Sequence, residues 1–292
     1  MGRKTRKSAA VNGVQPVLQA AGYSMFLATA GRSVEQEKTG LHAFVDHRVD
    51  GLLIATRGTQ LGDEAILEIT RQGVPVVTVG RPIHGSDVDR VTADHWRGAY
   101  DVVTHLIALG HKRIGFIGVA PADAPKLRRY HGYADALTQH GIQLREELVV
   151  GPAEGPGYAS EEDGYAGMER LMKVPRRPTA VFARNDYAAM GALRAAHDLG
   201  LAIPEDVAIA GFDNLPMAAY TTPPLTTVSQ PIVEQGLRAA EFLLDRIERR
   251  VKDGRRDISL DCKLIVRAST DSQAGRHGAA KPAAVRSTGG KS

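Results

Sequence analysis

The sequence predicts an α/β protein built on parallel sheets, and three observations carry that prediction. Short β-branched apolar runs alternate with helical patterns along most of the 292 residues, as in successive βαβ units. Most of these runs are continuously apolar, as strands are when helices cover both faces of their sheet. Two α/β halves follow one another without a sequence repeat. Two such domains placed edge to edge would form a ligand cleft at the carboxyl ends of their strands.

The predicted elements follow in chain order. Strands are expected at Ser24–Ala28, Gly51–Ala55, Val74–Val79, Arg113–Gly118, Ala180–Ala183, Val207–Gly211, Leu225–Ser229 and Ile258–Val266. Helices are expected at Gly13–Ala21, Ser33–His47, Ala65–Gln72, Arg97–Leu109, Lys126–His140, Gly164–Met172, Tyr187–Leu199 and Val233–Arg250. Residues 272–292 are rich in Gly, Ala and Ser and are predicted to form a disordered tail.

Composition excludes several classes of protein. Hydrophobic residues make up 43% and charged residues 24%, the balance of a globular protein in water. No apolar run approaches the ~20 residues that span a bilayer, and the basic N-terminus lacks the apolar core of a secretory signal. We therefore expect a cytoplasmic protein with no membrane partner. The single Cys262 excludes a disulfide within the chain and a cysteine-based metal site.

The formal net charge of +4 is carried by the two ends of the chain. Residues 1–10 and 272–292 hold eight basic residues and no acidic one, which leaves −4 for residues 11–271. A mildly acidic core does not indicate a large phosphate-binding face. We interpret the basic ends as solvated tails rather than arms that bind nucleic acid.

Polar side chains follow the predicted strands, where parallel sheets bind ligands. Arginine forks, carboxylates and amides at such positions suit hydroxyl-rich or carboxylate-bearing ligands. The residues concerned are Asp94, Arg129, Arg184, Asn185, Asp186, Asp213 and Asn214.

Each of these residues also has a purely structural interpretation. Asp94 and Asp186 stand just before helical stretches and could be N-caps, an alternative favoured for Asp186 and evenly balanced for Asp94. Arg129 could be a surface charge, and Asp213 with Asn214 could be turn residues. Their shared placement after strands is what favours a binding site.

Catalytic motifs are missing from the sequence. It contains no G-x-S-x-G elbow, no H-E-x-x-H, no phosphate-binding Walker loop and no G-x-G-x-x-G after a strand. Its ten histidines are scattered, and no nucleophile–base pair is visible. The sequence therefore favours a binding protein without a cofactor or metal over an enzyme.

A series of motifs then occurs in one order from about Asn12 to Thr270. They are Val49–Ile54, Val91–Asp94 with Gly98-Ala99, His105–Gly118, Pro178–Asp186, Ile203–Val207, Gly211–Asp213, Pro224–Val228 and Val266–Thr270. Over nearly its whole length, the chain resembles the sensor core of the LacI/GalR family of repressors. That core is itself similar to periplasmic sugar-binding proteins.

The resemblance implies a fold of the periplasmic-binding-protein type I, with two Rossmann-like subdomains, parallel sheets and an interdomain ligand cleft. The N-terminal sensor subdomain would comprise residues 11–92 plus 230–256. The C-terminal one would comprise residues 93–229 plus 257–271. The resemblance also implies a ligand-responsive transcriptional regulator that forms a homodimer and binds a sugar or related metabolite. The alternative is a stand-alone sugar-binding protein of the transport type.

Matching positions imply the effector-binding residues. Arg129 matches the family's ligand-gripping arginine, and Asn185 and Asp213 match its polar pocket residues. Asp94 often joins them, and Gln230 matches a position at the rim of the hinge. Asp123, like Pro125, falls where other members often carry a pocket serine or threonine, which leaves the identity of the effector open.

Full-length members of the family begin with a helix-turn-helix headpiece, and here the match begins only near Asn12. Basic residues 1–10 match neither a recognition helix nor an apolar strand, so we expect the first strand of the N-terminal half to be missing. The coding sequence would then begin upstream, or the chain would be a truncated remnant. Operator DNA is an expected partner only if an upstream headpiece exists, and these 292 residues alone should bind it weakly. The operator sequence, and whether the effector induces or co-represses, stay open.

Overall fold

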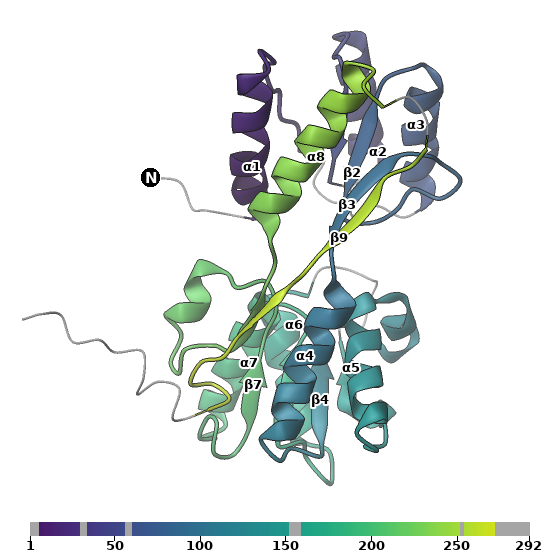
Figure 1. Cartoon of the computed structure of the whole chain (residues 1–292). Helices are drawn as coiled ribbons and strands as arrows, with labels where there is room; N and C mark the ends of the chain where they lie inside the picture. The colour runs from purple at the N-terminus through teal and green to yellow at the C-terminus, as the bar shows by residue number, and fades with distance from the viewer. Residues whose placement is uncertain (1–5, 30–33, 56–59, 152–158, 252–253, 272–292) are drawn as a thin grey trace, which may run out of the picture. The chain divides into compact units, whose positions relative to one another are not determined.

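The computed structural model describes residues 6–29, 34–55, 60–151, 159–251 and 254–271 (Figure 1). The chain divides into two compact units, Met1–Gly98 with Gln230–Lys263 and Ala99–Ser229 with Leu264–Ser292. Each unit has its own parallel sheet flanked by helices, which confirms the predicted α/β class. The expected tail at 272–292 lies outside the described residues.

The sheet of the first unit has four strands in the order β1-β2-β3-β9, all parallel. They are β1 (Leu52–Ile54), β2 (Val76–Val79), β3 (Asp89–Ala93) and β9 (Asp257–Leu260). Helix α8 packs on this sheet, where Ala239 and Leu243 join Val77 and Val91 in one buried cluster. A second cluster joins the strands to α2 and α3. The helices are α1 (Arg6–Ala20), α2 (Val34–Asp46), α3 (Gln60–Arg71) and α8 (Ile232–Ile247).

The C-terminal strand was expected in one piece and in the other half, and the structure corrects both points. Strand β9 pairs with β3, with Val91 opposite Ile258. It therefore belongs to the first unit. Strand β10 (Lys263–Ile265) follows after Asp261-Cys262 and pairs with β8 (Thr227–Ser229). The two halves of the segment therefore pair with different strands, β9 with β3 and β10 with β8.

The expected strand at Ser24–Ala28 is also wrong. Residues 23–29 have no regular structure, and Phe26 and Leu27 are 74% and 66% exposed. Within the described residues β1 pairs only with β2, so Ser24–Ala28 joins no ladder there. An apolar run with high strand propensity still needs a hydrogen-bonded neighbour to become a strand.

Helix α1 begins earlier than the sequence indicates, at Arg6 rather than at Gly13, and lies beside α8 (Figure 1). Two glycines allow the close approach of these helices. A Cβ atom on Gly13 would lie 1.9 Å from the Val233 carbonyl oxygen, and one on Gly236 would lie 2.3 Å from that of Ala10. Residues 6–10 are therefore helical, and Ala10 lies against Gly236 of α8.

The sheet of the second unit has the order β5-β4-β6-β7, again all parallel. Its strands are β4 (Ile114–Ile117), β5 (Val149–Val150), β6 (Ala180–Ala183) and β7 (Ala208–Ala210). Phe116 and Phe182 are fully buried on neighbouring strands, with ring centroids 5.4 Å apart. The helices are α4 (His95–Ala108), which begins in the first unit, α5 (Arg128–Gln139), α6 (Glu161–Met172), α7 (Asp186–Asp198) and the short η1 (Pro121–Lys126), η2 (Glu146–Leu148) and η3 (Pro216–Ala219).

No helix among the described residues is both long and apolar enough to cross a membrane.

Candidate functional site

Predicted ligand residues gather at the carboxyl end of the second unit's sheet. Arg129 lies in the first turn of α5, Asn185 follows β6, and Asp213 follows β7. The guanidinium of Arg129 donates from Nη2 to Asp213 Oδ1 at 3.2 Å and from Nη1 to the Arg184 carbonyl at 2.6 Å. The structure thus joins the start of α5 to the segments after β6 and β7, which are far apart in the sequence.

The Arg129–Asp213 ion pair is largely removed from water. The Arg129 side chain is 12% exposed and that of Asp213 is not exposed at all. Burying two charges is costly, and the cost is offset only where geometry and additional hydrogen bonds are good. Here Arg129 gains a hydrogen bond to the Arg184 carbonyl and a cation–π contact with Phe212. Its Cζ lies 3.9 Å from the centroid of the Phe212 ring. The result is a guanidinium fixed in one orientation.

A turn with unusual backbone geometry aims Asp213 at Arg129. Asp213 has φ +117° and Asn214 has φ +48°, values that residues with a side chain seldom adopt. Asp213 N donates to the Val228 carbonyl at 2.8 Å, and Asn214 N donates to Thr227 Oγ1 at 3.2 Å. The turn considered in the sequence analysis is therefore present, and β8 holds it in place.

Asn185 is fully buried and caps helix α7. Its Oδ1 accepts from the Ala188 backbone N–H at 2.8 Å, and its Nδ2 donates to the Ala159 carbonyl at 2.9 Å. Both ends of the amide thus bond to the protein. A role for Asn185 in ligand binding stays a prediction, and its structural role is established.

The favoured N-cap role of Asp186 is wrong, because Asn185 takes it and Asp186 is the first helical residue. The Asp186 carboxylate instead accepts from Leu215 N at 2.6 Å and from Thr227 Oγ1 at 2.5 Å. Burial raises the pKa of Asp186 to about 6, although these two hydrogen bonds act to lower it. Asp186 therefore ties α7 to the loop after β7.

Asp94 and Gln230 belong to the first unit. Asp94 Oδ1 accepts from Arg97 N at 2.9 Å at the start of α4, so the N-cap alternative is confirmed for this residue. Gln230 is buried, with Oε1 2.9 Å from His95 Nε2. His95 is in no motif of the sequence, so nothing in the sequence pointed to this contact.

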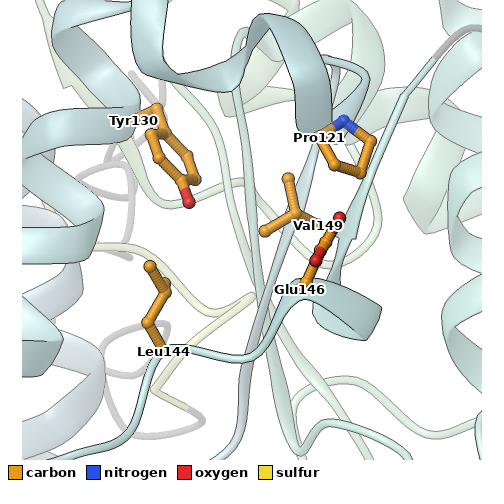
Figure 2. A pocket seen from close by; sticks show the side chains of 5 residues that line it. All are labelled: Pro121, Tyr130, Leu144, Glu146 and Val149. Carbon is orange, nitrogen blue, oxygen red and sulfur yellow. The ribbon is translucent and has the colours of Figure 1, made fainter.

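Asp123 lies in η1 of the second unit, half-buried. A pocket near this helix is lined by Pro121, Tyr130, Leu144, Glu146 and Val149 (Figure 2). None of the six predicted ligand residues lines it. The pocket therefore gives no support to the predicted site.

Comparison with known proteins decides the family. The description "Periplasmic binding protein-like domain" matches residues 103–270. The transcriptional repressor CytR of Escherichia coli K12 is 34% identical over 262 residues, which cover 89% of this chain and 74% of CytR. The repressor PurR of Pasteurella multocida is 32% identical, covering 86% of this chain and 73% of PurR.

The chain belongs to the LacI/GalR family. This confirms the resemblance drawn from the motifs. As a LacI/GalR protein it is a ligand-responsive transcriptional regulator, and the relatives favour this function over that of a transport-type binding protein.

Solved structures of LacI/GalR proteins share the fold. A LacI family regulator from Enterococcus faecium with bound ribose is 30% identical, with a TM-score of 0.76 over 90% of this chain and 93% of that one. The regulator CelR in complex with cellobiose is 31% identical, with a TM-score of 0.80 over 90% of this chain and 79% of that one.

Proposed function

We propose that this LacI/GalR regulator binds its effector, a sugar or related polar metabolite, through Arg129, Asn185 and Asp213. The observation that carries the proposal is the Arg129 guanidinium, fixed against Asp213 and the Arg184 carbonyl at the carboxyl ends of the strands. Parallel α/β sheets bind ligands at that edge. A guanidinium group held in one orientation can donate hydrogen bonds to two ligand oxygens at once.

Three further residues complete the proposed ligand set. They are Asp123, Asp94 and Gln230, which the family resemblance implies. Carboxylates accept from ligand hydroxyls, and an amide both accepts and donates. Support for a sugar-like effector comes from relatives whose structures hold ribose and cellobiose.

The proposal extends to assembly and location. We infer two sensor subdomains that correspond to the two units, a cytoplasmic homodimer and no catalytic activity. Operator DNA is a partner where a helix-turn-helix headpiece is present. Size-exclusion chromatography with light scattering tests the assembly. A particle of about twice the 31.3 kDa chain mass is expected, and a monomer at micromolar concentration would contradict the dimer.

A thermal-shift screen over sugars, sugar phosphates and nucleosides tests effector binding. A ligand of the wild-type chain should lose about ten- to hundredfold in affinity in Arg129→Gln, because a charge-assisted hydrogen bond contributes roughly 1.5–3 kcal/mol. Arg194→Gln is the matched control, since Arg194 lies on the exposed surface of α7 and pairs with Asp198. Equal affinity in wild type and Arg129→Gln would refute the assignment.

A further inference from the structure

The pocket of Figure 2 lies entirely within the second unit and contains none of the predicted ligand residues. Its volume is about 250 Å³. It is lined by Pro121 of η1, Tyr130 of α5, Leu144, Glu146 of η2 and Val149 of β5. Five different segments of the chain thus each contribute one side chain to its wall.

Tyr130 forms a preorganised aromatic wall of this pocket. Its ring packs edge-on against that of Phe116, with centroids 5.8 Å apart and planes at 85°, and its centroid lies 5.8 Å from that of Tyr133. Because Phe116 and Tyr133 are both fully buried, they hold the Tyr130 ring against the core. The hydroxyl end of Tyr130 points into the pocket (Figure 2).

Glu146 supplies a negative charge beside this aromatic wall. Burial raises the pKa of Tyr130, and the charge of the nearby Glu146 carboxylate raises it further. Glu147, the next residue, lies 3.7 Å from Arg113 and 3.8 Å from Arg145, whereas Glu146 forms no ion pair with any described residue. The arginines near η2 therefore approach Glu147, and the carboxylate that lines the pocket is that of Glu146.

The other lining residues are apolar. Val149 is buried on β5, which pairs with β4, and Leu144 is 37% exposed. A sugar would exchange its water for few hydrogen-bonding partners in such a pocket, and Glu146 would repel an anion. An organic cation suits the lining better, because its charge can interact with both a carboxylate and an aromatic ring while its apolar body contacts apolar side chains.

We propose that this pocket is a second ligand site, which binds a small organic amine with an apolar body. The ammonium group interacts with the Glu146 carboxylate and the Tyr130 ring, and the apolar body contacts Leu144 and Val149. The pocket shares no residue with the proposed effector-binding set, so the inference is tested separately from the proposed function.

Ligand-detected NMR titrations of the 292-residue chain test the ligand class with three compounds of similar shape, phenethylamine, phenylethanol and phenylacetate. Phenethylamine should bind about three- to fivefold more tightly than phenylethanol, since an ion pair with an exposed carboxylate contributes only modestly. Phenylacetate should bind most weakly, and added salt should reduce the advantage of the amine. Phenethylamine that fails to bind at millimolar concentration, or that binds no more tightly than phenylethanol, overturns the inference.

Variants assign the preference to the carboxylate of the pocket. Glu146→Gln should abolish the preference for phenethylamine over phenylethanol. Glu205→Gln is the matched control, because it removes the same charge from an exposed residue that precedes β7, at the opposite edge of the sheet from β5. A preference that survives in Glu146→Gln, or that both variants reduce equally, overturns the inference.

A third variant tests the apolar wall. Leu144→Ala should weaken phenethylamine and phenylethanol by a similar factor, because it removes apolar contact without changing charge. Leu144 and Glu146 are both exposed, so these variants should fold, and unchanged melting temperatures would verify this. Wild-type affinity for both compounds in Leu144→Ala would place their binding elsewhere and overturn the inference.

Discussion

At the scale of single residues, Asn185 and Asp186 show where sequence reasoning ends. Both residue types cap helices well and both follow the same strand, so their order alone does not decide which one caps α7. The structure decides it, because Asp186 finds two donors, Leu215 N and Thr227 Oγ1, on segments distant in the sequence. Contacts of that kind cannot be deduced from one sequence.

Asp186 should make stability depend on pH. Its pKa is about 6 in the folded chain and close to 3.8 when unfolded, so the folded state binds more protons between these values. The free energy of unfolding should therefore fall as pH rises from about 4 to about 6, by on the order of 2–3 kcal/mol from this group. In Asp186→Asn this contribution should vanish.

Urea unfolding of wild type and Asp186→Asn at several pH values between 4 and 7 measures the effect. The difference between their unfolding free energies removes the titration of all other groups. A difference that stays constant across this range would contradict the raised pKa of Asp186.

At the scale of elements, continuous apolar runs predicted β4 and β6, the two central strands of the second unit's sheet. The strand at Ala180–Ala183 has the predicted bounds, and β6 lies between β4 and β7 in its sheet. The predictions for Ser24–Ala28 and Ile258–Val266 were wrong. Both segments are apolar, but whether and where they form strands depends on hydrogen-bonding partners that are distant in the sequence.

The crossing of α1 and α8 should not tolerate a side chain at Gly13. Although alanine is the better helix former, its Cβ would overlap the Val233 carbonyl of α8. We expect Gly13→Ala to lower the free energy of unfolding by about 1–3 kcal/mol. Gly40→Ala in α2 is the matched control, because no atom lies within 4 Å of its added Cβ.

Chemical denaturation compares these two alanine variants. Gly40→Ala should leave stability unchanged or raise it by up to about 1 kcal/mol. Equal effects at the two positions would show that α1 does not pack tightly on α8.

A buried carboxylate ties three elements of the first unit together. Asp89 of β3 accepts from Arg246 of α8 at 2.8 Å and from Arg256, just before β9, at 2.7 Å. Burial acts to raise the pKa of Asp89, but the hydrogen bonds from Arg246 and Arg256 outweigh it and hold the pKa below its ordinary value.

Asp89→Ala should destabilise the first unit by about 3–5 kcal/mol, because it removes the buried carboxylate that accepts from both Arg246 and Arg256, even though Arg256 keeps its ion pair with Asp245. The exposed ion pair of Asp198 with Arg194 provides the control, and Asp198→Ala should change little. Thermal unfolding measures both variants. Similar melting temperatures for the two would mean that the Asp89 cluster does not hold β9 to the sheet.

At the scale of the whole molecule, the order of motifs indicated the family before any contact was known. The resemblance also assigned Arg129, on an expected helix, and Asp213, after an expected strand, to one ligand site, and the structure has them within hydrogen-bond distance. The sequence did not reveal that Asn185 is engaged by the protein, nor that Arg184 lies across Gly118. Both depend on side-chain directions that the packing of β4, β6 and their loops determines.

The most direct test of the central claim is a crystal structure of the chain with the effector found in the screen. We expect ligand oxygens within hydrogen-bond distance of the Arg129 guanidinium and the Asp213 carboxylate at the carboxyl end of the second unit's sheet. An effector bound elsewhere, with the Arg129–Asp213 pair untouched, would contradict it.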